Sequence, residues 1–225
     1  MSEQIRVLNR MCDVGLALYT AKDHKRSLSR IQLQKFIYLL DVIRYLYEML
    51  PPLEGHKTYK NGPYDSAIQN AVDAMAFRGL VKIRSLTSSN GNITSDYELT
   101  AAGLSWVEKL LSDQGIALRQ EAASEIASRV KLLGWHRLVD LVYAEPTFVN
   151  ARTHGYGQQL TPNDGLENTA ALLIQTICLG LSHGNQGNRI DRKLVIDLFF
   201  RYLDRYDKKV GSSESAPDKS LGDKN

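Results

Sequence analysis

The pentapeptide GLSHG, Gly180 to Gly184, matches the G-x-S-x-G pattern that surrounds the nucleophilic serine of many hydrolases. In those enzymes the serine lies on a sharp turn that follows a strand and precedes a helix. Here a long apolar run at helical spacing precedes the pentapeptide, and a segment rich in glycine and asparagine follows it. We therefore interpret the glycines as a helix terminator and do not assign Ser182 as a nucleophile.

Other residues that support catalysis or bind metals are widely separated in the chain. The histidines show no HxxxH or HExxH spacing, the two cysteines form no CxxC pair, and no GxxxxGK[ST] loop is present. These residues are His24, His56, His136, His154 and His183, with Cys12 and Cys178. Both cysteines fall within apolar helical patterns, which is typical of buried thiols. We therefore expect a protein that is not an enzyme and has neither a metal nor a cofactor.

The positive charge of the chain is concentrated in its first quarter. The 225 residues carry a formal net charge of +3, and residues 1–60 alone contain ten basic and six acidic side chains. A clustered excess of this kind can bind phosphates without reading a base sequence. The possible phosphate contacts are Arg30, Lys35, Lys57, Lys60, Lys82 and Arg84. For each of these residues taken alone, a solvated side chain that binds no ligand is at least as good an interpretation as a phosphate contact.

The first half of the chain predicts helices followed by a small hairpin. In order, the pattern predicts a helix over 3–21, a helix after the cap Ser29 that stops at Pro51, a helix over 65–78, strands on either side of Asn90-Gly91, and a helix after the cap Thr100. This is the order of a winged helix-turn-helix domain, which we place at residues 1–112.

The second half predicts only helices, so the fold class is mainly α with a small β-hairpin. We assign residues 113–210 to a helical domain or extension, and 211–225, rich in serine, glycine and charge, to a disordered tail. A long connection from Glu145 to Asp164 combines aromatic residues, Arg152, His154 and glycines. Such a segment is either an ordered docking loop or a simple crossover between helices.

The helix predicted at 65–78 has the wrong charge for reading DNA. Gln69 and Asn70 on its outer face could hydrogen-bond to adenine, but Asp65 and Asp73 would repel phosphates. We therefore expect this helix to contact a protein, and any DNA contact to be independent of sequence. The possible partner-docking residues are Tyr64, Gln69, Asp73, Phe148, Arg152 and His154.

A glycine-proline turn precedes this helix. Pro63 restricts its own φ and removes a donor, while Gly62 permits a sharp reversal of the backbone. We interpret the pair as a device that sets the direction in which the helix leaves the preceding one.

Several of these patterns resemble a known family. The runs LQKFIYLLDVI, YKNGPYDSAIQNAVDAMAFRGLV and YELTAAGLSWV resemble the winged-helix pattern of SocA/Panacea-like antitoxin domains. With LVDLVYAEPTFVNARTHGYGQQL added, the chain looks most like the middle component of bacterial ABC three-component defence systems, of which Lamassu is one. The resemblance spans roughly residues 28–160. It gives structural roles to Leu33, Lys35, Tyr38, Gly62, Pro63, Tyr64, Leu99, Thr100 and Gly103.

The resemblance implies a non-catalytic adaptor that acts against phage or plasmids. Its expected partners are an SMC-like ATPase and an effector such as a nuclease, with possible non-specific contact to double-stranded DNA. Two alternatives remain open, a winged-helix transcriptional repressor and an antitoxin-like adaptor. The N-terminus has no apolar signal region and no run reaches the ~18 apolar residues of a membrane span, so we expect a cytoplasmic protein without membrane contact.

Overall fold

The computed structural model describes residues 3–47, 49, 55–89, 92–160, 168–184 and 190–214. The elements are, in chain order, α1 (Glu3–Asp23), β1 (Leu28–Ser29), α2 (Arg30–Ile43), a 3-10 turn (Arg44–Tyr47), α3 (Ser66–Phe77), β2 (Val81–Ser89), β3 (Asn92–Leu99), α4 (Ala101–Leu110), α5 (Gln114–Leu133), a second 3-10 turn (Trp135–Arg137), α6 (Leu138–Tyr143), α7 (Pro146–Arg152), α8 (Thr169–Gly184) and α9 (Arg192–Glu214). The prediction of a mainly helical fold with a small antiparallel sheet is confirmed. No described helix is both long and apolar enough to cross a membrane.

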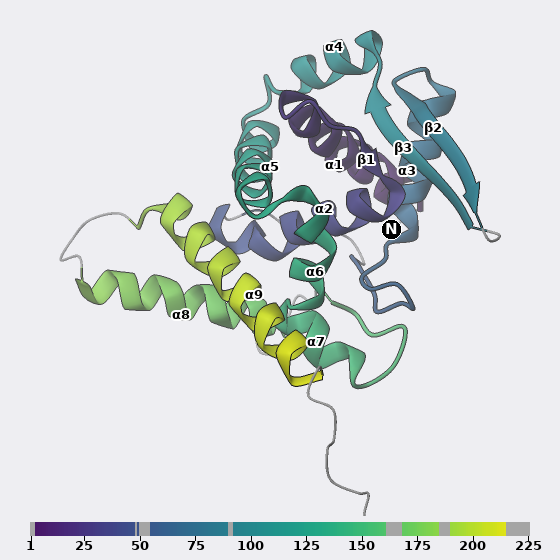
Figure 1. The fold of residues 1–225 in the computed structure, drawn as a ribbon. Helices are drawn as coiled ribbons and strands as arrows, with labels where there is room; N and C mark the ends of the chain where they lie inside the picture. Colours follow the sequence, from purple (N-terminus) through teal and green to yellow (C-terminus); the bar gives the residue numbers. More distant parts are fainter. Residues whose placement is uncertain are drawn as a thin grey trace, which may run out of the picture.

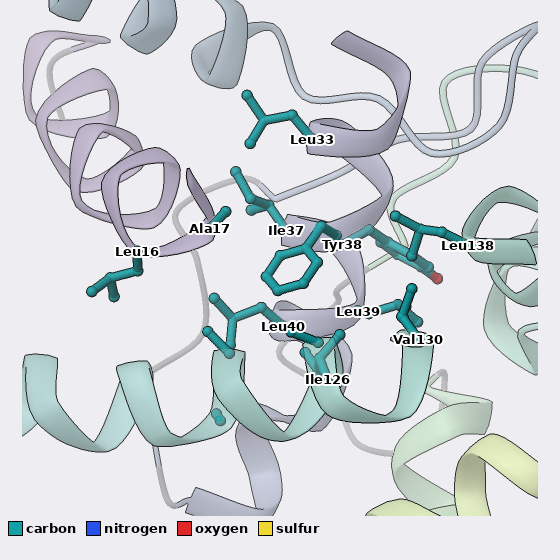
Figure 2. Packing of buried hydrophobic residues seen from close by; sticks show 14 of the residues in the cluster. Leu16, Ala17, Leu33, Ile37, Tyr38, Leu39, Leu40, Ile126, Val130 and Leu138 are labelled. Carbon is teal, nitrogen blue, oxygen red and sulfur yellow. The ribbon is translucent and has the colours of Figure 1, made fainter. Parts of the chain in front are cut away.

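Helix α2 lies at the centre of the fold (Figure 1). It begins as predicted, because Ser29 and Gln32 form a reciprocal capping box. Every residue from 33 to 43 is buried, which agrees with its nearly continuous apolar sequence. Figure 2 shows Ile37 and Leu40 of α2 packed among side chains of α1 and α5. The helix ends at Ile43 and continues as a 3-10 turn, earlier than predicted, and residues 50–54 with the expected stop at Pro51 lie outside the described residues.

The sheet has the order β1-β3-β2 and is antiparallel throughout. The predicted hairpin is confirmed, with Val81 opposite Leu99 at its base and Ser89 opposite Asn92 near its tip. The turn residues 90–91 lie outside the described residues. Gly79 has a φ of +70° between α3 and β2, as a helix-terminating glycine should. The two-residue strand β1, which pairs with β3, was not predicted.

The second half of the chain packs directly on the first. Helix α5 contacts α1 and α2, α6 contacts α2, and α8 and α9 lie side by side at the end of the molecule away from the sheet (Figure 1). Residues of both halves belong to one hydrophobic core, which continues across residue 112. The division into two domains at 112 therefore stays a prediction about organisation and does not coincide with a break in the core.

Two predictions in the second half were wrong in part. The connection after Glu145 is not loop throughout, because residues 146–152 form α7. Glu145 caps this helix by accepting hydrogen bonds from the amides of Thr147 and Phe148, and Pro146 suits its first turn. The predicted tail also begins later than residue 211, because α9 continues to Glu214; residues 215–225 lie outside the described part of the chain.

Candidate functional site

Four polar side chains on α2 are buried, and each holds a different segment against this helix. A buried polar group is costly unless it is hydrogen-bonded, so each one specifies a neighbour. The four side chains are those of Gln34, Lys35, Tyr38 and Asp41. Their partners lie on α1, α5, the start of α3, the glycine-proline turn and the start of α7. These contacts position the surface segments described below.

Asp41 is the centre of a buried ion-pair network. Its carboxylate accepts a hydrogen bond from Arg10 of α1 at 2.8 Å and one from Arg119 of α5 at 3.1 Å. Asp13 binds the same two arginines at 2.7 and 2.5 Å. Burial alone would raise the pKa of Asp41, but the charges and hydrogen bonds of its neighbours, those of Arg10 first among them, together outweigh burial and hold that pKa well below its usual range. The charged carboxylate thus joins α1, α2 and α5.

The network extends to the start of α3. Asp65 caps this helix through the amide of Ala67, and its two carboxylate oxygens bind Arg6 at 2.5 Å and Arg10 at 2.8 Å. The Gln34 side chain also makes two hydrogen bonds to the backbone of Asp65. The expectation that Asp65 faces outward and would repel phosphates was therefore wrong for this residue, because its carboxylate is buried and paired with Arg6 and Arg10. Helix α3 is fixed rigidly to α1 and α2.

Lys35 holds the glycine-proline turn against α2. Its amine donates to the carbonyl oxygens of Asn61 at 2.6 Å and Pro63 at 2.9 Å, and burial lowers its pKa to about 7. Gly62, with a φ of +87°, lies so close to α2 and α6 that an added Cβ would be 2.6 Å from the lysine amine and 2.5 Å from the Tyr143 ring. Glycine is therefore required at position 62 for two reasons: its φ is positive, and there is no room for a side chain.

The start of α7 is fixed by a buried hydrogen bond from Tyr38 to Glu145. Both side chains are fully buried, and burial raises the pKa of Glu145 while the hydrogen bond from Tyr38 opposes that shift. The carboxylate also caps α7, so one side chain joins α2 to the first turn of that helix. The connection that follows α7 consequently starts from a defined place in the fold.

That connection pairs with the segment before the glycine-proline turn. Thr58 donates its amide to Gln158 at 2.8 Å and accepts from Gly157 at 2.9 Å, and the amide of Leu160 donates to His56 at 2.9 Å. The Thr58 hydroxyl adds a hydrogen bond to the Gly155 carbonyl at 2.8 Å. The two segments that the sequence singled out are thus brought together and held by main-chain hydrogen bonds.

Three tyrosine rings lie together where these segments meet. The ring centroid of Tyr59 is 5.5 Å from that of Tyr64 and 6.5 Å from that of Tyr156. Tyr59 is 59% exposed and Tyr156 is 74% exposed, while Tyr64 is half-buried and accepts a 3.4 Å hydrogen bond from Arg30. We refer to Tyr59, Tyr64 and Tyr156 as the tyrosine surface.

The predicted phosphate contacts do not share one environment. Arg30, Lys57 and Lys60 are exposed around the tyrosine surface. Lys82 and Arg84 lie on β2, where both pair with Glu98 at 2.7 and 3.2 Å. Lys35 was assigned wrongly, because it is 2% exposed and its hydrogens are directed to backbone carbonyls.

Most predicted docking residues are accessible, but they lie on two surfaces. Tyr64, Arg152 and His154 belong to the two paired segments, whereas Gln69 and Asp73 lie on α3 and hydrogen-bond to each other at 2.8 Å. Phe148 was assigned wrongly: it is 4% exposed, because its ring stacks on Tyr143 in the core.

Sequence reasoning missed the exposed apolar side chains beside α3. Phe77 at the end of this helix is 93% exposed, and Ile83 and Leu86 of β2 are also exposed. Their pattern is that of ordinary helix and strand residues, so only the packing reveals their exposure. Tyr59 and Tyr156 were missed as site residues because nothing local in the sequence indicates that they meet.

The described part of the chain contains no group of three or more His, Cys, Asp or Glu side chains arranged to hold a metal ion. Ser182 lies within α8, and its hydroxyl donates to the Cys178 carbonyl at 2.9 Å, as helical serines commonly do. The strand-to-helix turn of a nucleophile elbow is therefore not present at Ser182.

Comparisons of this chain with protein-family models, with curated proteins and with solved structures found no match.

Proposed function

We propose that this protein is an adaptor built on a winged-helix domain, and that α3 and the adjoining hairpin dock a protein partner. The winged-helix assignment is supported by the order α1-β1-α2-α3-β2-β3 and by the pairing of the short β1 with β3. Helix α3 would then occupy the place that a DNA-reading helix takes in such domains.

The accessible side of α3 favours protein over DNA. Ser66 and Asp73 are exposed on this helix, and Gln69 is half-buried. Residues 66–77 contain no lysine or arginine, and the nearest basic residue along the chain is Arg78, which caps the C-terminal end. Phosphate contacts from Lys and Arg supply most of the affinity of DNA binders, and this face offers few of them. The exposed carboxylate of Asp73 would in addition repel the phosphates of DNA.

The observation that carries the proposal is the exposed apolar group of Phe77, Ile83 and Leu86. Phe77 is 93% exposed at the end of α3, and Ile83 and Leu86 are exposed on β2, the strand that follows this helix. Exposed apolar and aromatic side chains are typical of the centre of a protein interface, while polar residues form its rim. Gln69 and Asp73 supply such polar groups on the same helix.

Rigid presentation also favours a docking role. The cap Asp65 is bound by two arginines, and Gln34 fixes its backbone, so α3 cannot rotate without breaking a buried network. A preformed surface lowers the entropic cost of association. The partners implied by the sequence resemblance are an SMC-like ATPase and an effector such as a nuclease, and these partners are part of the proposal.

Co-purification tests this role. We expect the tagged protein, expressed with its neighbouring genes, to recover a coiled-coil ATPase, and we expect Phe77→Glu to abolish that recovery. Leu132→Glu on α5 is the matched control, because Leu132 is 75% exposed but lies on another element. It should retain the partner.

Two results would contradict the proposal. One is undiminished recovery of the ATPase by Phe77→Glu. The other is a lone dimer that binds its own promoter with sequence preference, which would make the protein a repressor that reads DNA through α3.

A further inference from the structure

We propose that the tyrosine surface, with the cations around it, binds single-stranded nucleic acid. This inference is independent of protein docking at α3, because it concerns other residues: those of segment 55–64, which precedes α3, and of segment 152–160. It differs also from the non-specific duplex contact expected from sequence, since it needs unpaired bases.

The rings are suited to base stacking. Tyr59 lies between Tyr64 and Tyr156, with interplanar angles of 36° and 46° and centroid distances of 5.5 and 6.5 Å. These distances exceed the ~3.4 Å spacing of stacked bases in one strand. Successive bases would therefore be separated from one another and would each lie against a tyrosine, as in proteins that bind single strands.

The backbone keeps the rings in place. Hydrogen bonds between Thr58 and both Gly157 and Gln158 hold the segment of Tyr156 beside that of Tyr59. On the other side, Lys35 binds the carbonyls within the turn that connects Tyr59 to Tyr64. The rings are thus carried on fixed main chain, so a ligand need not order these segments.

The charge around the rings is positive. Arg30, Lys57, Lys60 and Arg152 are exposed here, and neither 55–64 nor 152–160 contains an aspartate or glutamate. The next acidic residue after the turn, Asp65, is buried and paired with arginines. Cations of this kind can follow a phosphate backbone while the rings hold the bases.

Open space lies over part of the surface. Gly155 and Gly157 have φ values of +94° and +84°, and an added Cβ at either position would meet no atom of the described residues within 4 Å. Their conformation favours glycine, and the lack of side chains lets a ligand approach the backbone beside Tyr156.

A base-paired duplex and an acidic peptide fit this surface less well. In a duplex the base faces are covered by their neighbours, so exposed tyrosine rings gain no stacking contact. An acidic peptide would use the cations but leave the rings without a specific partner. Unpaired bases on a phosphate backbone use both, which is why we assign this ligand class.

Fluorescence anisotropy of the full chain tests the assignment, with labelled dT15, labelled rU15 and a 15-base-pair duplex at two salt concentrations. We expect dT15, rU15 or both to bind more tightly than the duplex. Binding of both would show that the shared chemistry is recognised, whereas binding of one alone would identify the strand as DNA or RNA.

Tyrosine variants show whether the rings are responsible. Tyr59→Ala and Tyr156→Ala should each weaken binding by roughly tenfold or more, because each variant loses the stacking of one base on an aromatic ring. Tyr202→Ala is the matched control, since Tyr202 is exposed on α9, and it should bind as the unchanged protein does. Both site rings are exposed, so their removal should leave the circular dichroism spectrum unchanged.

A charge variant gives a second readout. Replacing both Lys57 and Lys60 by Gln should reduce the steepness of the log-affinity against log-salt plot by about 1.4, the value for two lost contacts to a single strand. The proposal is overturned if the duplex binds as tightly as dT15 and rU15, or if the tyrosine variants bind like Tyr202→Ala. It is also overturned if polyglutamate displaces a bound labelled oligonucleotide as well as the same oligonucleotide without label does.

Discussion

Replacing Lys35 by Met should change how the stability of this protein depends on pH. Lys35 is 2% exposed, and its amine meets the carbonyl oxygens of Asn61 and Pro63. A neutral amine has two hydrogens, which these two carbonyls can accept. Burial lowers the pKa of Lys35 from 10.5 to about 7, so the folded protein favours the neutral form in mildly alkaline solution.

The sign and size of the effect follow from proton binding. Between pH 7 and 10.5 the unfolded chain holds a proton on Lys35 that the folded chain releases, so the free energy of unfolding rises with pH. Below pH 7 both states are protonated, and the cost of the buried charge is fully present. A lowering of this pKa from 10.5 to about 7 corresponds to about 5 kcal/mol. From pH 7 to pH 9 the protein should recover about 2 kcal/mol of it.

Urea unfolding followed by circular dichroism at pH 7, 8 and 9 measures this difference. The unchanged protein should gain about 2 kcal/mol from pH 7 to 9 relative to Lys35→Met, because the methionine has no proton to lose. Comparing the two proteins cancels the contribution of other titrating groups, such as Cys12, whose pKa burial raises. Lys60→Met is the matched control, because Lys60 is on the exposed part of the same turn. The free energy of unfolding of this variant should change with pH as that of the unchanged protein does. Equal pH dependence of the unchanged protein and Lys35→Met would refute the reasoning.

Two further predictions concern packing and buried charge. Asp41→Asn should lower the free energy of unfolding by about 3–5 kcal/mol, because the buried Arg10 and the partly buried Arg119 lose a charged partner; a loss below about 1 kcal/mol in urea unfolding would contradict the network. Gly103→Ala should destabilise the protein by about 1–3 kcal/mol, because the added Cβ would lie 2.0 Å from the Leu80 carbonyl oxygen. Gly180→Ala, in a helix with open space around it, should instead stabilise by about 0.5–1 kcal/mol, and thermal melts of the two glycine variants should shift in opposite directions.

The parts of the fold that sequence predicted correctly depend on close neighbours in the chain. Ser29 and Thr100 cap helices through amides three residues away, so their role is visible in a short window. The hairpin is similarly local. Helix α7 was not predicted although Glu145 and Pro146 carry a start signal, because a helix of seven residues is too short to show a clear apolar period.

The candidate site could be predicted only in pieces. The glycine-proline turn and the connection after α7 were both singled out by composition, and several of their exposed cations were named. Their meeting depends on hydrogen bonds between residues about a hundred positions apart, such as that between Thr58 and Gln158. No local pattern reports such a contact, so neither the tyrosine surface nor the exposure of Phe77 could be inferred.

The sequence by itself determined the helices, their caps and the hairpin, because hydrogen bonds within a few residues and apolar periodicity set them. It also determined which residues are polar in the middle of α2. Only the tertiary structure decided what those residues do: Lys35 and Asp41 are charged types in an apolar helix, and in isolation they could face solvent, phosphate or protein. Burial forces each side chain to take an internal partner, since an unpaired buried polar or charged group is too costly, and those partners hold the glycine-proline turn, α1 and α5 against α2.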